Sequence, residues 1–268
     1  MVSERAGPAL LEMRGISKHF GGLQALNGVD LTLHAGELLA IVGDNGAGKS
    51  TLIKILTGVY AASEGAITMD GQPVSIPNRR ASIELGIDAV YQNLALVDYL
   101  TAPENVYLGN ELKRSFLGIP VLDNGAMREK AARLLKDRLG ISLGNIDQHA
   151  FFLSGGQRQA VAIGRALIQE TVRILILDEP TAALGPEETR RMLEVVQRLK
   201  GKEMGLIMIS HQLEDVFELS DRIMVLRNGR LAGVRRTADT SRQEVLGLIV
   251  GSIRDGEAEA GAGSAVAS

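Results

Sequence analysis

The chain has 268 residues, enough for one large domain or for a core domain with an inserted subdomain. Its net charge is −3 with acidic and basic residues mixed along the sequence, so no basic field indicates a nucleic-acid partner. It contains no cysteine, which excludes disulfides and thiolate metal sites and is consistent with a cytosolic protein. Signal-peptide layout is missing and no apolar run approaches the roughly 20 residues of a membrane-spanning helix, so we expect any membrane role to be peripheral.

Residues 9–70 are predicted to form strands and turns around a glycine-rich loop. Residues 31–33 alternate between apolar and polar side chains, and the dipeptide at 35–36 predicts a turn after them. The strand-like run at 66–69 ends at Asp70-Gly71, a dipeptide typical of tight hairpins.

The glycine-rich segment 43–51 fits the phosphate-binding loop pattern, two glycines separated by four residues and followed by Lys and Ser. An apolar run at 38–42 precedes it and apolar residues at helical spacing follow, so it would join a buried strand to a helix. Backbone N–H groups would surround a phosphate chain, Lys49 would lie near the β- and γ-phosphates, and the Ser50 hydroxyl can hold Mg²⁺. A glycine turn with a surface lysine is the competing interpretation. The loop residues are Gly43, Asp44, Asn45, Gly46, Ala47, Gly48, Lys49, Ser50 and Thr51.

Residues 93–150 are predicted to be a mostly helical insertion, because apolar residues recur at helical spacing with charged residues between them. Strand-like runs return at 174–177, 206–209 and 223–226, and a helix beginning at Pro186 lies between the first two. Alternating strands and helices predict a parallel sheet covered by helices. The apolar positions of the insertion are Met127, Ala131, Leu134, Leu135 and Leu139.

The last predicted helix ends near Gly251. Thr240 or Ser241, with Gln243 or Glu244 three residues later, makes a capping box at its start. The residues after it are mostly Gly, Ala, Ser and Glu, so we expect a disordered tail over 252–268.

Two adjacent acids, Asp178 and Glu179, follow the apolar run at 174–177. A parallel sheet places ligands at the carboxyl ends of its strands, so these acids are expected beside the glycine-rich loop. Asp178 can support Mg²⁺, and Glu179 can orient or deprotonate a water that attacks the γ-phosphate. The competing interpretation is that the pair only starts a turn at Pro180.

A second cluster of small residues, Leu-Ser-Gly-Gly-Gln at 153–157, precedes a predicted helix over 158–169. Its glycines and serine could form another anion-binding nest, although a plain N-cap would explain Ser154 equally well. Placed between a phosphate-binding loop and a strand ending in Asp-Glu, the pentapeptide resembles the signature of ATP-binding-cassette (ABC) ATPases. The resemblance covers about residues 9–250.

The resemblance implies an α/β fold: a P-loop NTPase core with a mostly parallel, helix-covered sheet, an N-terminal antiparallel β subdomain and an inserted α-helical subdomain. The ABC ATPase domain would span 9–251, with the helical subdomain at about 93–165. The implied ligands are ATP and Mg²⁺, and Ser50, Gln92 and Asp178 would serve the metal.

Further site residues are implied by the same resemblance. Gln92 matches the glutamine that senses Mg²⁺ and the attacking water, and His211 matches the histidine that contacts the γ-phosphate; with Glu179 they form the predicted catalytic set. Phe20 matches the aromatic residue that stacks on adenine, the alternative being an ordinary core phenylalanine. In the family two cassettes pair head to tail, so the signature residues would contact ATP held by a second copy. These residues are Ser154, Gly155, Gly156 and Gln157.

One position departs from the family pattern. After the segment 178–184 the family usually has Asp, whereas this chain has Gly185. That side chain normally helps to couple the two ATP sites, so we expect their coupling to differ here.

Several stretches, including the loop residues Asp44-Asn45 and the run 181–185, resemble monosaccharide importers of the ribose, xylose and fructose type, in the branch with a single cassette. The implied function is the energy-coupling ATPase subunit at the cytoplasmic face of the inner membrane, bound to transmembrane permease subunits and indirectly to a periplasmic sugar-binding protein. Residues 94–110 would receive the permease. The ATPase of an exporter and a soluble, non-transport cassette protein are the alternatives.

Overall fold

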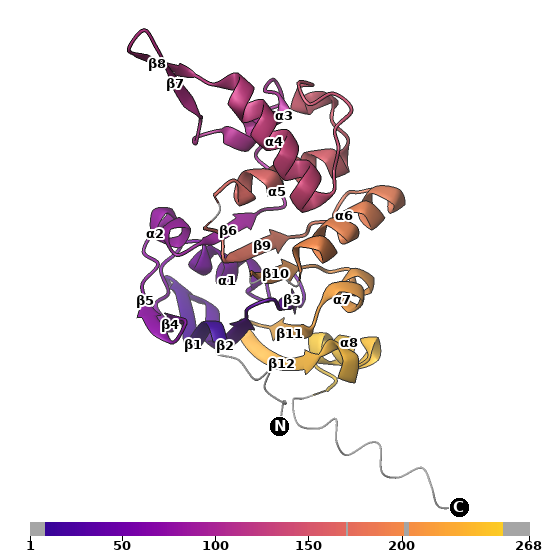
Figure 1. Ribbon diagram of the computed structural model, residues 1–268. Coiled ribbons are helices and arrows are strands. Elements are labelled where there is room, and N and C mark those ends of the chain that lie inside the picture. The colour runs from indigo at the N-terminus through magenta and orange to yellow at the C-terminus, as the bar shows by residue number, and fades with distance from the viewer. Residues whose placement is uncertain (1–8, 170, 201–203, 254–268) are drawn as a thin grey trace, which may run out of the picture.

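A six-stranded sheet forms the centre of the molecule (Figure 1). The computed structural model describes residues 9–169, 171–200 and 204–253, so the predicted tail lies outside the described residues from 254 onward. Five strands are parallel and β12 runs antiparallel at one edge, which confirms the predicted sheet and adds an edge strand to it. In spatial order the strands are β12 (Arg230–Arg236), β11 (Arg222–Arg227), β3 (Leu38–Val42), β10 (Gly205–Ile209), β9 (Ile174–Asp178) and β6 (Ile87–Val90).

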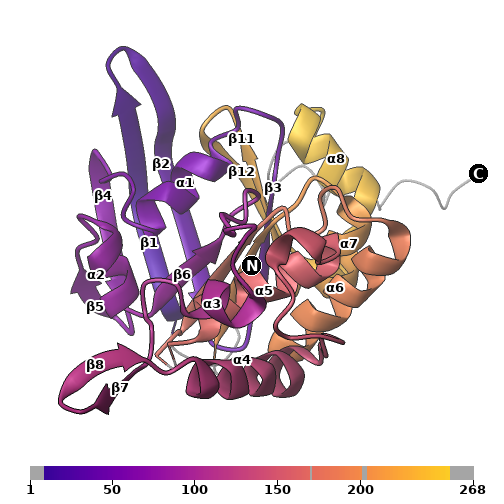
Figure 2. The ribbon, with the colours of Figure 1, turned by 90° about the horizontal axis from the view of Figure 1, so that it is seen from above.

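Both faces of this sheet are buried, because side chains alternate between two apolar cores. Leu39 and Ile41 of β3 enter one core, which they share with α1 and the N-terminal strands. Leu38 and Val42 enter the other, against the helices of the opposite face (Figure 2). The helices of these two faces include α1 (Lys49–Leu56) and α2 (Arg79–Glu84) on the first, then α6 (Pro186–Leu199), α7 (Leu213–Leu219) and α8 (Arg242–Val250) on the second.

A separate antiparallel sheet lies beyond α1, as the resemblance implied. Its strands, in spatial order, are β2 (Leu23–His34), β1 (Ala9–Phe20), β4 (Glu64–Met69) and β5 (Gln72–Val74). The predicted hairpin between the last two is confirmed: Asp70 and Gly71 both have positive φ, as a two-residue turn matched to strand twist requires.

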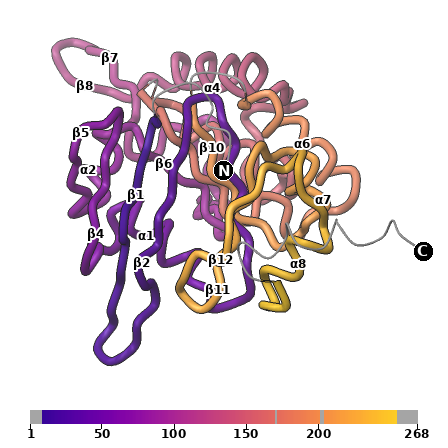
Figure 3. The backbone as a smooth tube through the Cα atoms, turned by 90° about the horizontal axis from the view of Figure 1, so that it is seen from below, coloured from indigo at the N-terminus to yellow at the C-terminus, as the bar shows by residue number. Residues whose placement is uncertain are grey.

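Residues 93–167 contain a helical cluster with its own small core. It consists of α3 (Ala102–Tyr107), α4 (Asn124–Leu139), a short 3₁₀ turn (Ala150–Phe152) and α5 (Gly155–Leu167). The apolar residues predicted at helical spacing lie on α4, four of them buried. The prediction of a mostly helical insertion missed a β-hairpin, β7 (Lys113–Phe116) with β8 (Ile119–Leu122), which extends away from the rest of the molecule (Figure 3).

Two helix starts refine the predictions. α5 begins at Gly155 rather than 158, because Ser154 caps it and Gln157 completes a capping box. Ser241 caps α8 as predicted, but the carboxylate of Glu244 binds Arg235 and Thr240 and does not close the box. A 3₁₀ turn (Thr237–Asp239) precedes α8. None of the helices in the described parts of the chain has the length and apolar character needed to cross a membrane.

Candidate functional site

The glycine-rich loop leaves the buried strand β3 and enters α1 with Gly48 as the N-cap. Two of its glycines have no room for a side chain. A Cβ on Gly43 would lie 2.1 Å from the carbonyl oxygen of Leu226, and one on Gly48 would lie 2.6 Å from Cδ2 of Leu26. Both have positive φ, so glycine is required for conformation as well as for space. A loop held this tightly at the start of a helix is suited to a phosphate site.

Lys49 closes this loop on itself. Its ammonium group donates to the carbonyl oxygens of Gly43 at 2.6 Å and Asp44 at 3.0 Å. Partial burial lowers the pKa of Lys49, and the carboxylates of Glu179, Asp44 and Asp178 oppose that shift. Among the described residues, the Lys49 ammonium is hydrogen-bonded to neutral carbonyl oxygens and not to a carboxylate. Its positive charge can therefore attract an anion that enters the loop.

A cavity of about 500 Å³ opens directly over the loop. Phe20 lines it with 39% of its surface exposed, and its ring lies edge-on to Tyr60 with 5.0 Å between centroids. Phe20 is therefore not the core residue that we considered as the alternative. Its place at the mouth of the cavity suits a flat apolar ring such as a nucleobase. The lining residues are Phe20, Leu23, Gln24, Ala25, Asn45, Gly46, Ala47, Gly48, Lys49, Ser50, Thr51, Asn228 and Gly229.

The sequence did not indicate the part of this lining that comes from the turn between β11 and β12. The N–H of Gly229 donates to the carbonyl of Ala47 at 3.1 Å, so the turn is hydrogen-bonded to the phosphate-binding loop. The dipeptide Asn228-Gly229 was a readable hairpin signal, but only the parallel pairing of β11 with β3 brings it to the loop.

Asp178 and Glu179 lie at the carboxyl end of β9, as predicted, next to the end of β10, which in turn adjoins β3. Glu179 has a φ of +54°, an unusual value for a residue other than glycine, and its N–H donates to the carbonyl of Ile209 at 2.9 Å. This turn directs its carboxylate toward His211, whose Nδ1 lies 2.7 Å from Oε2 of Glu179. Backbone strain at a carboxylate beside a phosphate site is typical of functional residues.

Burial raises the pKa of Asp178, and the neighbouring Glu179 carboxylate raises it further, while Lys49 and Lys54 oppose both. The ionised form is thus disfavoured in the folded chain. The resulting loss of stability is absent below the ordinary pKa of 3.8 and grows as the pH rises through the higher pKa of the folded state.

We therefore expect Asp178→Asn to stabilise the free protein at pH 7 while impairing hydrolysis. Solvent screens a half-buried charge, so the rise in Tm should be only about 1–2 °C, and it should shrink toward pH 4. Thermal unfolding of both proteins across this pH range measures the effect. Asp98→Asn, at a carboxylate paired with Arg158, is the control. A gain in Tm that grows in acid would contradict the assignment.

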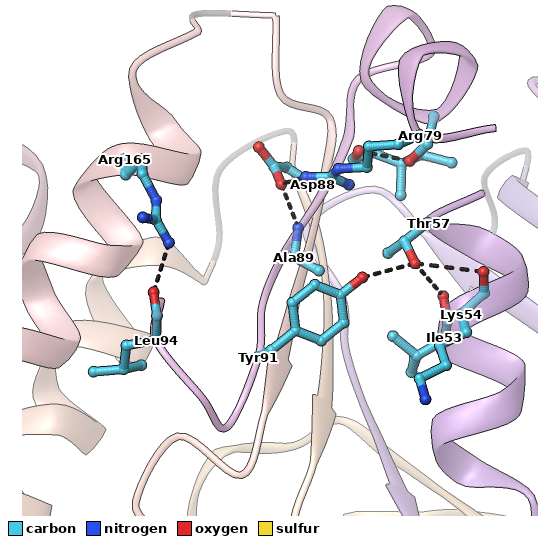
Figure 4. A network of polar contacts seen from close by, with 11 residues as sticks. Ile53, Lys54, Thr57, Arg79, Asp88, Ala89, Tyr91, Leu94 and Arg165 are labelled. Carbon is cyan, nitrogen blue, oxygen red and sulfur yellow. Dashed lines mark hydrogen bonds and ion pairs between the residues drawn. The ribbon is translucent and has the colours of Figure 1, made fainter. Parts of the chain in front are cut away.

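Gln92 lies on the loop after β6 and is exposed, with no side-chain hydrogen bond among the described residues. The loop around it is held from two sides (Figure 4). On one side the Tyr91 hydroxyl donates to Thr57 at 2.8 Å, next to the end of α1. On the other side Arg165 of α5 donates to the carbonyls of Leu94 at 2.6 Å and Ala95 at 2.8 Å. The position of Gln92 is thus linked to both helices that follow the two glycine-rich motifs.

Arg165 also holds a strained backbone, because Ala95 has a φ of +48°. We expect Arg165→Gln to lower kcat about 10-fold with less than a twofold change in ATP affinity, since the change would misplace Gln92 without touching the phosphate-binding loop. Arg165→Lys should recover part of the loss. Steady-state kinetics and nucleotide binding separate the two effects, with Arg190→Gln on the exposed face of α6 as control. Parent-like kcat in a folded Arg165→Gln protein would exclude this positioning role.

The signature residues lie at the start of α5 and line a different cavity, of about 280 Å³. Within one chain the structure does not bring Ser154, Gly156 and Gln157 into the cavity over the phosphate-binding loop. Ser154 caps α5, and its hydroxyl also helps to lower the pKa of Glu188. The N–H of Gly156 donates to Glu188 at 3.4 Å, so this N-terminus already attracts a carboxylate.

Gly185 is the N-cap of α6, in an extended conformation that any residue could adopt. Nothing within 4 Å would obstruct a Cβ there. The segment before it is anchored instead by Thr181, whose buried hydroxyl donates to Asp215 at 2.6 Å. Space therefore does not explain the glycine in place of the usual Asp.

Comparison with known proteins agrees with this geometry. Residues 26–182 match the family described as ABC transporter. The chain belongs to this family. It is 48% identical over 244 residues to the ribose import ATP-binding protein RbsA 1 of Rubrobacter xylanophilus, and 42% identical over 242 residues to ribose import ATP-binding protein RbsA of Caldanaerobacter subterraneus. Each alignment covers 90% of this chain and 47% or 48% of the relative, so the chain spans about half the length of these family members.

Solved structures of the family share the fold. The ADP conformation of MJ1267, an ATP-binding cassette of an ABC transporter, superposes with a TM-score of 0.78 at 28% identity, covering 91% of this chain and all of that one. A dimeric structure of MJ0796, a bacterial ABC transporter cassette, gives a TM-score of 0.70 at 25% identity, covering 85% of this chain and 98% of that one. These likenesses support the predicted P-loop NTPase fold.

Proposed function

We propose that this protein is the ATP-hydrolysing subunit of a membrane ABC importer for a monosaccharide. The observation that carries the hydrolytic part is the contact of Glu179 with His211 at the strand ends that also carry Lys49 and the phosphate-binding loop. A carboxylate fixed there can orient the attacking water and accept its proton. The import part rests on the ribose import proteins to which the chain is similar.

Each predicted residue has a role in the proposed site. Phe20 would stack on the base, and the loop residues 43–51 would enclose the phosphates. Mg²⁺ usually takes only one or two protein ligands beside phosphate oxygens, and Ser50, Gln92 and Asp178 offer oxygen donors of the kind it prefers. Bound there, the metal would neutralise charge that develops on the γ-phosphate. Gln92 and His211 would then position the water and the γ-phosphate for Glu179.

The proposed partners follow from the separation of the two glycine-rich motifs. The signature residues Ser154, Gly155, Gly156 and Gln157 would contact ATP in a second copy, an arrangement supported by the dimeric family structure. We place the protein peripherally at the cytoplasmic face of the inner membrane, bound to a permease through residues 94–110 and indirectly to a periplasmic sugar-binding protein. The catalytic domain would span 9–251, with 93–165 as its helical subdomain.

Reconstitution tests the proposal. The chain is co-expressed with a candidate permease and binding protein from the same genome, and ATP hydrolysis and sugar uptake are measured in vesicles with ribose, xylose, fructose and maltose. We expect Mg²⁺-dependent hydrolysis that one of the three monosaccharides stimulates. Hydrolysis without any import would leave an exporter or a non-transport ATPase, and absence of hydrolysis would refute the enzyme assignment.

A further inference from the structure

The β7–β8 hairpin is a ribbon without a partner. Its strands pair only with each other, and no other described element packs extensively against either of them. Every residue from Lys113 to Pro120 is exposed. Figures 1 and 3 show the ribbon extending past the end of α4, away from both sheets. An isolated two-stranded ribbon is marginal in water, so it is expected to gain stability from a partner surface.

The tip of this ribbon is apolar. Phe116 and Ile119 form its last cross-strand pair and are 60% and 64% exposed, and Leu117 in the turn between them is 88% exposed. Leu117 also has a φ of +50°, where Asn, Asp or Gly would be favoured. Leucine at this position is therefore unfavourable both for the turn and for its contact with water. An exposed leucine at such a turn indicates that another surface buries it on binding.

Positive charge lies directly behind the apolar tip. Lys113 and Arg114 stand on β7, and the ribbon carries no acid between Leu112 and Leu122. The acids that flank it, Glu111 and Asp123, lie at its base, where they accept hydrogen bonds from the backbone N–H groups of Gly109 and Ala126. The order along the ribbon is thus apolar, then cationic, then anchored to the helical cluster.

We propose that this ribbon inserts its tip into the interface of an anionic lipid membrane. A narrow, convex, apolar end fits the boundary between headgroups and acyl chains, and two cations placed behind it fit the headgroup layer. A protein groove would also accept apolar side chains, but two cations on a ribbon with no acid between Leu112 and Leu122 favour an anionic surface. The contact goes beyond the proposed function, since it needs neither ATP nor a permease.

The absence of tryptophan from the sequence allows a direct test with the full chain. Leu117→Trp provides a single indole reporter at the tip, and indole favours the membrane interface. The protein is mixed with phosphatidylcholine vesicles with or without phosphatidylglycerol, and binding is followed by the emission wavelength and by flotation. The control is Val250→Trp, an exposed position of α8 at the opposite end of the molecule (Figure 1).

We expect a blue shift of the emission of Leu117→Trp with anionic vesicles and none for Val250→Trp. Adding Phe116→Ser and Ile119→Ser should abolish binding, and Lys113→Gln or Arg114→Gln should each weaken it roughly fivefold, the value of one charge near an anionic surface. Unchanged emission with anionic vesicles, or binding only when the vesicles contain the permease, would overturn the proposal. ATP hydrolysis is not a readout, so this outcome is independent of the proposed function.

Discussion

Glu179→Gln is expected to lower the steady-state rate of ATP hydrolysis by roughly 10²- to 10⁴-fold, the usual contribution of a general base, while ATP binding persists. The amide keeps the shape of the carboxylate at the turn near Ile209 and His211, but it cannot accept a proton. ATP that is bound and not hydrolysed should then hold two copies together. Phosphate release at saturating Mg²⁺ and ATP, followed by size-exclusion chromatography with and without ATP, measures both effects.

The matched control for this variant is Glu187→Gln. Glu187 lies in the first turn of α6, is exposed, and among the described residues forms an ion pair with Arg191, so its replacement should leave hydrolysis within about twofold of the parent. His211→Ala should reduce turnover less than Glu179→Gln, because it removes a group that positions the γ-phosphate and the carboxylate but leaves the base in place. Parent-like turnover of Glu179→Gln would show that another group is the base.

The sequence predicted those parts of the site that depend on local pattern. The glycines at 43 and 48 belong to a loop whose spacing is set by the phosphate chain, and the acids at 178 and 179 are placed by the end of one strand. Parallel pairing of β3, β10 and β9 then brings these separate segments together, as the general rule for such sheets predicts.

Other features depend on tertiary contacts and could not be predicted. No sequence pattern singles out Arg165, because only the chain path after β6 brings the carbonyls of Leu94 and Ala95 within its reach. The β7–β8 ribbon was missed because its apolar residues do not alternate with polar ones, as a half-buried strand would require. The pattern was unusual because the ribbon has no core to face.

Lys49→Ala is expected to weaken ATP binding about 10- to 150-fold, the loss of one or two charge-assisted hydrogen bonds to phosphate. The free protein should remain folded, since the hydrogen bonds of the Lys49 ammonium to other described residues are those to the carbonyls of Gly43 and Asp44, and the side chain is partly exposed to water. Titration with a fluorescent ATP analogue and thermal unfolding distinguish lost binding from lost structure. Lys54→Ala is the control, a lysine of the same helix whose Nζ lies 5.5 Å from the ring of Tyr60.

A second substitution separates charge from shape at this position. Lys49→Arg keeps the positive charge, but a planar guanidinium must fit where a compact ammonium now lies 2.6 Å from a carbonyl oxygen inside the closed loop. If the point charge alone attracts the phosphates, Lys49→Arg should bind ATP almost as the parent does. If the loop is shaped around the ammonium, affinity should fall nearly as far as in Lys49→Ala, and the steric limits at Gly43 and Gly48 favour this result. Parent-like ATP affinity in Lys49→Ala itself would show that Lys49 does not bind the phosphates, and it would contradict the proposed phosphate-binding role of the loop.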